Sequence, residues 1–367
     1  MKRKFVSLCF LIFGVAISHA QSPEKAKEES TEDARKPLII AFPAAYYTPE
    51  TEWGFGAGGV FNFFLNKKDT ISPSSQIQLA GSYTLRKQVL FYLPLNFYWN
   101  EFKNVIESEL GYYDYIYPFY GLGDSSLEEN REDYSSRYFR LKFDGLRRVH
   151  NQTFVGVRYW LDTPDIYKVK EDGILENEVI LGESGGTISG IGPQLRIDKR
   201  DNIYSPKAGT YLNTFFQRFS KTIGSEFNFS RFRVDSRKYI PLKKTTLAMQ
   251  LYSDVNWGDV PFFQKARLGG TKFVRGFLEG RFIDDVSLIS QVELRRPIYK
   301  KRWGGVAFLS TGAVSPRIEK VFDSSWTYSY GAGIRFLLDL EKGVNARVDV
   351  AFTPEGSNFY LTIGEAF

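Results

Sequence analysis

The sequence predicts an all-β protein, a transmembrane β-barrel of about sixteen antiparallel strands. Three observations carry this prediction. Apolar and polar residues alternate with a period of two along most of the 367 residues, which is typical of strands whose two faces meet different surroundings. Aromatic residues make up 16% of the chain, although a quarter of it is charged. After residue 20, no stretch is long and apolar enough for a transmembrane helix.

Residues 1–20 have the pattern of a secretory signal peptide. A basic start is followed by an apolar run from Val6 to Ile17 and by small residues that end at Ala20. Cleavage there removes three of the 48 basic residues and none of the 42 acidic ones, so the formal net charge falls from +6 to +3. It also removes Cys9, the only cysteine. We therefore expect an exported protein without disulfides, cofactors or a cysteine-based metal site.

Residues 21–36 are predicted to form a short charged linker in the periplasm. Nine of these sixteen residues are charged and none is aromatic, which favours disorder. Sixteen residues are also too few to form a folded domain. The predicted barrel therefore occupies residues 37–367.

Sixteen segments show strand patterns, and an even number is expected of a single-chain bacterial barrel. The predicted strands are 38–47, 53–64, 75–86, 88–99, 104–119, 135–148, 151–162, 188–199, 209–220, 225–240, 245–257, 284–297, 304–314, 328–339, 345–353 and 358–367. The two longest interruptions, 163–187 and 258–283, follow odd-numbered strands. Both therefore lie outside the cell if the N-terminus is periplasmic, as expected because outer loops are the long ones.

The two faces of these strands differ in a way that favours a membrane barrel over a soluble sandwich. The apolar face is broad and aromatic, as in residues 89–99. The other face carries arginines and carboxylates together, as in residues 231–237, and Arg347 and Asp349 alternate with apolar residues in the same way. This pattern indicates lipid outside and a wet, salt-bridged lumen inside.

The predicted outer loop 258–283 contains the most informative motif. Its sequence from Leu268 to Phe277 is LGGTKFVRGF, which places one arginine among glycines. Glycines let the backbone fold back tightly, and an arginine held there can reach a buried carboxylate as a two-pronged donor. The motif residues are Gly269, Gly270, Val274, Arg275, Gly276 and Phe277.

The last predicted strand has the features of an assembly signal for barrels in the outer membrane. It places Phe359, Leu361, Ile363 and Phe367 on one face, with Gly364 between the last two. An amphipathic strand that ends in an aromatic residue, after a signal peptide and many strands, is typical of such proteins.

These motifs together resemble the BamA/TamA family of outer-membrane barrels. Residues 198–212 are similar to the family's inner turn between the eighth and ninth strands, and residues 44–54 are similar to its first hairpin. The glycine-rich loop resembles the sixth outer loop, which folds into the lumen in the family. The resemblance implies that Arg275 pairs with Glu293 and with position 310. Ser310 stands where the family usually has Asp, so we expect the anchoring of Arg275 to be weaker or to rely on Glu293.

The resemblance also implies a function. It places the protein in the bacterial outer membrane, in contact with lipid and with other barrel proteins or assembly-machine subunits, where it assists protein insertion or export. The family's periplasmic polypeptide-transport (POTRA) domains have no counterpart in residues 21–36, so the sequence is similar to a barrel-only subgroup. The alternative is a passive channel or structural barrel with a loop-plugged lumen.

Two enzyme-like motifs do not predict an enzyme. The GESGG sequence at 182–186 has the form of a hydrolase elbow, but that elbow needs a strand-to-helix turn and a histidine. His150 lies at the other end of a predicted strand from Ser184. The GFGAGG sequence at 54–59 continues as a strand, so it lacks the helix that binds phosphate in dinucleotide sites. We expect no metal site and no nucleic-acid partner.

Overall fold

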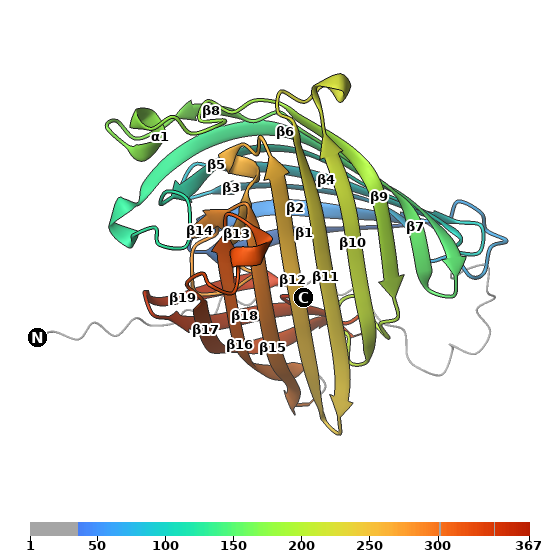
Figure 1. The fold of residues 1–367 in the computed structure, drawn as a ribbon. Helices are drawn as coiled ribbons and strands as arrows, with labels where there is room; N and C mark the ends of the chain where they lie inside the picture. The colour runs from blue at the N-terminus through green and yellow to red at the C-terminus, as the bar shows by residue number, and fades with distance from the viewer. Residues whose placement is uncertain (1–35, 301, 341) are drawn as a thin grey trace, which may run out of the picture. The chain divides into compact units, whose positions relative to one another are not determined.

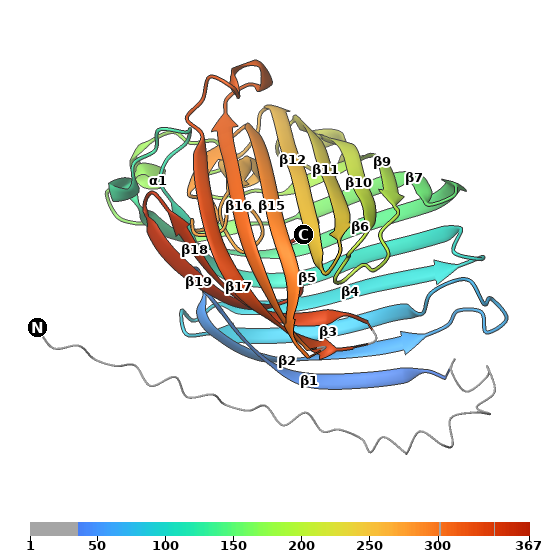
Figure 2. The ribbon, with the colours of Figure 1, turned by 90° about the horizontal axis from the view of Figure 1, so that it is seen from below.

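The structure is a computed structural model that describes residues 36–300, 302–340 and 342–367. The predicted signal peptide, and the charged linker except Lys36, lie outside the described residues. Within the described part of the chain, sixteen antiparallel strands close into one barrel (Figures 1 and 2), and one further strand joins their sheet. The predicted fold class is therefore confirmed.

The barrel strands agree with the predicted segments to within a few residues at most ends. They are β1 (Leu38–Thr48), β2 (Glu52–Phe63), β3 (Ser75–Thr84), β4 (Val89–Trp99), β5 (Asn104–Phe119), β6 (Glu132–His150), β7 (Thr153–Asp162), β9 (Ile188–Asp198), β10 (Gly209–Phe219), β11 (Phe229–Leu242), β12 (Thr245–Gly258), β15 (Val286–Tyr299), β16 (Trp303–Ser315), β17 (Thr327–Asp339), β18 (Val344–Thr353) and β19 (Gly356–Ile363).

The remaining elements are short and lie in the connections. They are β8 (Asp165–Lys168), β13 (Ala266–Leu268), β14 (Phe282–Asp284), α1 (Ile174–Asn177) and 3-10 turns at Glu128–Asn130, Lys221–Ile223, Phe262–Gln264 and Ile318–Lys320. In the part of the chain that the structure describes, no helix has the length and apolar character needed to cross a membrane.

Each barrel strand pairs with its neighbours along the chain, and β1 and β19 complete the ring. This last junction, which we call the seam, is short. Tyr47 lies opposite Leu361 there, whereas β1 pairs with β2 along all eleven of its residues, from Leu38 to Thr48. The seam is therefore the junction of the described barrel strands with the fewest paired residues, and few ladder hydrogen bonds hold it.

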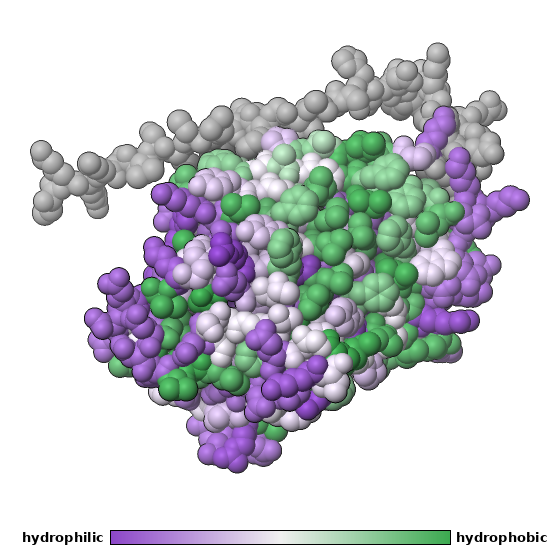
Figure 3. Space-filling view, turned by 90° about the horizontal axis from the view of Figure 1, so that it is seen from above, coloured by the Kyte–Doolittle hydropathy of each residue, from purple (hydrophilic) through white to green (hydrophobic). Residues whose placement is uncertain are grey.

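The barrel has an apolar outer surface and a charged lumen, as the alternation predicts. Phe55, Tyr83 and Leu309 are more than half exposed on the outside. Figure 3 shows a broad zone of hydrophobic residues on one face, with hydrophilic residues gathered toward the edges of the view. Inside, Arg158 on β7 pairs with Asp144 on β6 at 2.6 Å. Such pairs satisfy polar groups that cannot face lipid.

The connections at one end of the barrel pack on one another through an apolar cluster. Ile166 and Leu175, from the connection between β7 and β9, are buried with Phe119, Phe262 and Ile283. The sequence pattern showed this connection as an interruption, yet it contains β8 and α1. Their packing fixes the base of the loop that carries Arg275.

Candidate functional site: the lumen loop and the seam

The connection between β12 and β15 is a hairpin that carries the glycine-rich motif at its tip. β13 and β14 pair from Ala266 opposite Asp284 to Leu268 opposite Phe282. The loop tip, residues 269–281, begins where these strands end. Gly269 has φ = 103°, and a Cβ there would lie 1.9 Å from the backbone oxygen of Leu278. Only glycine fits such a close backbone approach, so this residue sets the fold of the tip.

Val274 adopts a strained backbone conformation beside the key arginine. Its φ is 45°, in the left-handed region that a β-branched residue rarely occupies. Such strain costs on the order of 1–3 kcal/mol and persists where the surroundings enforce it. The Val274 side chain is fully buried with Leu268, Phe277 and Ile289. This packing offsets the strain and orients Arg275 away from the apolar cluster.

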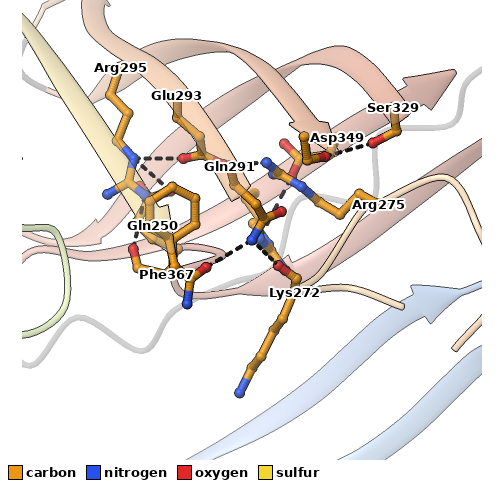
Figure 4. Close-up of polar contacts among 12 residues, drawn as sticks. Gln250, Lys272, Arg275, Gln291, Glu293, Arg295, Ser329, Asp349 and Phe367 are labelled. Carbon is orange, nitrogen blue, oxygen red and sulfur yellow. Dashed lines mark hydrogen bonds and ion pairs between the residues drawn. The ribbon is translucent and has the colours of Figure 1, made fainter. Parts of the chain in front are cut away.

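Arg275 is completely buried and joins two carboxylates (Figure 4). Its Nη1 lies 2.6 Å from Oδ2 of Asp349 on β18, and its Nη2 donates to Oε1 of Glu293 on β15. The guanidinium also lies 3.6 Å from the ring centre of Phe308 on β16. A planar guanidinium can engage two carboxylates and an aromatic face at once, which a lysine cannot do.

The second partner of Arg275 is Asp349 and not Ser310. The Ser310 hydroxyl forms a 2.8 Å hydrogen bond with the Ser329 hydroxyl, and the expectation of a contact with Arg275 is wrong at this position. Asp349 supplies from β18 the charge that position 310 lacks on β16. The sequence did indicate a lumen-facing carboxylate at Asp349, because Arg347 and Asp349 occupy the polar face of an alternating strand.

A chain of alternating charges extends from the Arg275 clasp. Arg295 Nε lies 2.7 Å from Oε2 of Glu293, and Arg335 Nη1 lies 2.5 Å from Oδ1 of Asp349. Arg335 Nε also bonds to Oε2 of Glu365 at 2.8 Å. Each carboxylate is thus shared between guanidiniums, which compensates much of the cost of burying these charges. The clasp is held by β15, β17, β18 and the segment after β19.

The segment after β19 turns into the lumen, which corrects the prediction for the last strand. Phe359 and Ile363 are exposed on the outer face as expected, with Leu361 at the seam. The strand ends at Ile363, however, and Gly364 has φ = 88°. Phe367 is buried, so it does not share a face with Phe359 and Ile363, contrary to what the alternation predicted.

Phe367 packs in the lumen with Tyr239 and Ala248. Its backbone oxygen accepts a 2.9 Å hydrogen bond from Arg295 Nη2 (Figure 4). The alternation of the strand could not reveal this turn, because a positive φ at glycine leaves no periodic trace.

The loop tip contacts both sides of the seam. Gly276 N donates to the Tyr360 hydroxyl at 2.8 Å, and Asn358 Nδ2 donates to Gly276 O at 2.7 Å, so the motif is tied to β19. On the other side, Glu279 N donates to Oε1 of Glu50 at 2.9 Å. Glu50 lies in the hairpin between β1 and β2. The loop therefore bridges the two strands that close the barrel.

The Glu50 carboxyl is an unusual group in this bridge. It is 4% exposed and has a second carboxylate, Glu279, nearby. Burial raises the pKa of Glu50 above its usual range, and the charge of Glu279 acts in the same direction. The hydrogen bond from Glu279 N opposes this shift. The bridge between loop and hairpin thus depends on a carboxyl that gains a proton more readily than usual.

The residues of the two enzyme-like motifs do not form a site. His150 ends β6 at one end of β7, and Ser184 lies next to Gly185, which pairs with Asp165 beyond the other end of β7. The glycines at 54–59 lie within β2 and are not followed by a helix. His150 and Ser184 are thus kept apart by the length of β7.

Comparisons with known proteins agree with this geometry. The family model described as the Omp85 superfamily domain matches residues 123–367. A solved structure of BamA from Haemophilus ducreyi lacking POTRA domains 1–3 is similar, with a TM-score of 0.59 and 14% identity over 90% of this chain and 70% of that one. None of the curated proteins matches the sequence.

Two CdiB structures are similar as well. CdiB from Escherichia coli has a TM-score of 0.60 at 12% identity, covering 89% of this chain and 62% of its own. CdiB from Acinetobacter baumannii has a TM-score of 0.57 at 11% identity, and the match covers 89% of this chain and 59% of the CdiB chain. The chain thus spans about three fifths of the CdiB chains, and at these identities the likeness establishes the fold.

Proposed function

Because the chain belongs to the Omp85 superfamily, we propose that this outer-membrane barrel assists the insertion or export of other proteins, by pairing an incoming strand with the open edge of β1. The observation that carries the proposal is the short seam. Of the eleven residues of β1, Tyr47 is the one placed opposite a residue of β19.

The free edge of β1 suits strand addition. Among the described residues, those from Leu38 to Tyr46 pair with β2 on one side and have no strand on the other. Ile39 is 74% exposed, and Leu38 and Phe42 are also exposed. An unpaired strand edge offers backbone donors and acceptors to an extended segment, while apolar side chains favour a partner at the lipid boundary.

Depletion of the protein in its native bacterium tests this function. If it assists insertion, the amounts of other barrel proteins in the outer membrane fall as the protein is depleted, and if it assists export, particular secreted proteins fall instead. Quantitative proteomics of outer membrane and medium measures both. Unchanged levels of every barrel and secreted protein would refute the proposal.

The loop in the lumen also supports a second candidate, a channel or structural barrel that the loop plugs. Arg275 is the buried anchor of that loop. In planar lipid bilayers, the wild-type protein should conduct little, and Arg275→Ala should open it. If neither protein conducts, the plugged-channel function is excluded.

A further inference from the structure

A cavity of about 490 Å³ lies in the lumen between the loop and the barrel wall. We call it the lumen cavity. Its wall is formed mainly by β5, β6, β7, β11 and β12, and the loop contributes residues from Phe263 to Phe273 and Glu279. The Arg275 clasp does not line it. The cavity is large enough for a small organic molecule, and rigid elements surround it on both sides.

The cavity is lined by more cations than carboxylates. Its three carboxylates already have partners among its arginines. Asp162 pairs with Arg140 at 2.7 Å, Asp254 with Arg233, and Glu279 with Arg267 at 3.7 Å. Three further cations, Arg231, Lys265 and Lys272, also line the cavity. Lys265 pairs with Asp285 at 2.5 Å, Arg231 shares Asp254 with Arg233, and Lys272 has no carboxylate partner among the described residues. Positive charge is therefore in excess, which favours an anionic occupant.

Lys272 is the clearest unpaired cation of the cavity. It extends from the loop tip away from the clasp (Figure 4), and its side chain is exposed to the cavity. Across the described residues, its amine has neither an ion pair nor a hydrogen bond. Its backbone oxygen accepts a 2.8 Å hydrogen bond from Gln291 Nε2, so the base of the side chain is fixed while its charge remains available.

Aromatic side chains complete the lining. Tyr115, Tyr134 and Tyr252 line the cavity, and the described structure shows no hydrogen bond to their hydroxyls. Tyrosines present ring faces to the carbon atoms of a ligand and hydroxyls to its oxygen atoms. The surplus cations and the tyrosines together fit a small molecule with an anionic group on a hydroxylated ring.

We propose that the lumen cavity binds an acidic saccharide, with Lys272 neutralising its phosphate or carboxylate and the tyrosine wall holding its ring. The anionic group can be a sugar phosphate or a uronate, since both have the chemistry that Lys272 recognises. This site is separate from the seam and does not depend on the proposed function.

Isothermal titration calorimetry on the full-length protein in detergent tests the site. Glucose 6-phosphate and glucuronate are the probes, and glucose and inorganic phosphate are the comparison ligands. At least one acidic sugar should bind, glucose should not, and inorganic phosphate should bind at least tenfold more weakly than that sugar. The stronger of the two probes identifies the anionic group. The proposal fails if neither probe binds, or if glucose or phosphate binds as tightly.

Variants assign the binding to the cavity. Lys272→Gln should weaken binding at least tenfold, whereas Lys221→Gln, an exposed lysine in the connection between β10 and β11, should leave it unchanged. Because the Lys272 amine has no partner, its removal should not unfold the loop. Tyr134→Phe removes one unbonded hydroxyl and should weaken binding severalfold. Wild-type affinity in both the Lys272 and Tyr134 variants would overturn the proposal.

Discussion

Arg275 shows how a single side chain can join a glycine-rich loop to the barrel wall. It is fully buried, and its two partners lie on strands separated by β16 and β17. Breaking a buried ion pair from one side leaves the other charges without compensation, which typically costs about 3–5 kcal/mol. Because Arg295 and Arg335 still compensate the two carboxylates, we expect the cost here to lie at the lower end.

Arg275→Ala should therefore destabilise the protein by about 3 kcal/mol. Urea unfolding in detergent, followed by the shift of the heat-modifiable band in gel electrophoresis, measures the change. Arg275→Lys keeps the charge but cannot reach both carboxylates, so it should lie between wild type and Arg275→Ala. A wild-type unfolding curve for Arg275→Ala would show that the clasp does not stabilise the loop.

Asp349 and Ser310 should differ sharply when each is replaced. Asp349→Asn removes the charge shared by Arg275 and Arg335, and we expect a loss of at least about 2 kcal/mol. Ser310→Ala breaks one hydrogen bond to Ser329, and we expect a loss of about 1 kcal/mol. The same unfolding measurement ranks the two variants. The reverse order would mean that position 310 anchors the loop after all.

The sequence could predict Glu293 but not the choice of Asp349 over Ser310. Alternation places all three positions on polar faces, and which of them reaches Arg275 depends on the curvature of the barrel. That curvature comes from the shear of sixteen paired strands, which no local pattern contains. The lumen cavity is also absent from any local pattern, since its residues come from strands far apart in the sequence.

At the scale of elements, alternation predicted the barrel strands well and the irregular segments poorly. The strand β5 has the predicted bounds, because its lipid and lumen faces differ along its whole length. β8 and α1 are four residues each, too short to show a period. The end of β19 was missed because Gly364 turns the chain while the apolar pattern continues to Phe367.

The bridge between the loop tip and the β1–β2 hairpin should depend on pH through Glu50. Its pKa in the folded protein is raised by burial and by Glu279. The folded state then binds a proton more tightly than the unfolded chain does. The resulting stability is fully present below the ordinary glutamate pKa, and it is lost as pH rises through the raised value.

Glu50→Gln should remove this dependence. Glutamine keeps an oxygen to accept the hydrogen bond from Glu279 N but carries no charge. Amide hydrogen exchange of residues 276–281, measured from pH 4 to pH 8, should show protection that falls with pH in the wild type and changes less in the variant. Glu319→Gln, an exposed glutamate in the connection between β16 and β17, is the control. Equal pH profiles for wild type and Glu50→Gln would contradict this role.

At the scale of the whole molecule, the seam and the loop form one mechanical unit. The barrel is closed by a junction with few hydrogen bonds, and the loop tip supports that junction from inside through Tyr360, Asn358 and Glu50. Side-chain contacts thus partly replace the missing ladder. A junction held in this way can open without unfolding the other strands, because their pairing is independent of it.

A covalent link across the seam should therefore block function without preventing folding. Tyr47 and Leu361 are direct partners, so replacing both by cysteine allows a disulfide between β1 and β19. Cys9, the only natural cysteine, lies in the predicted signal peptide and should not interfere. Phe55→Cys with Tyr83→Cys, a matched outward-facing pair across β2 and β3, is the control.

The seam variant is then expressed in cells depleted of the wild-type protein. Its disulfide should lower the levels of the same barrel or secreted proteins that depletion lowers, and a reducing agent should restore those levels. The control disulfide should have no effect, because β2 and β3 are already joined along ten residues and need not separate. Each single cysteine variant shows whether loss of Tyr47 or Leu361 alone is harmful. If the oxidised seam variant supports wild-type levels of these proteins, strand addition at β1 is not how this barrel acts. If the levels fall and the reducing agent restores them, the activity requires the seam to open.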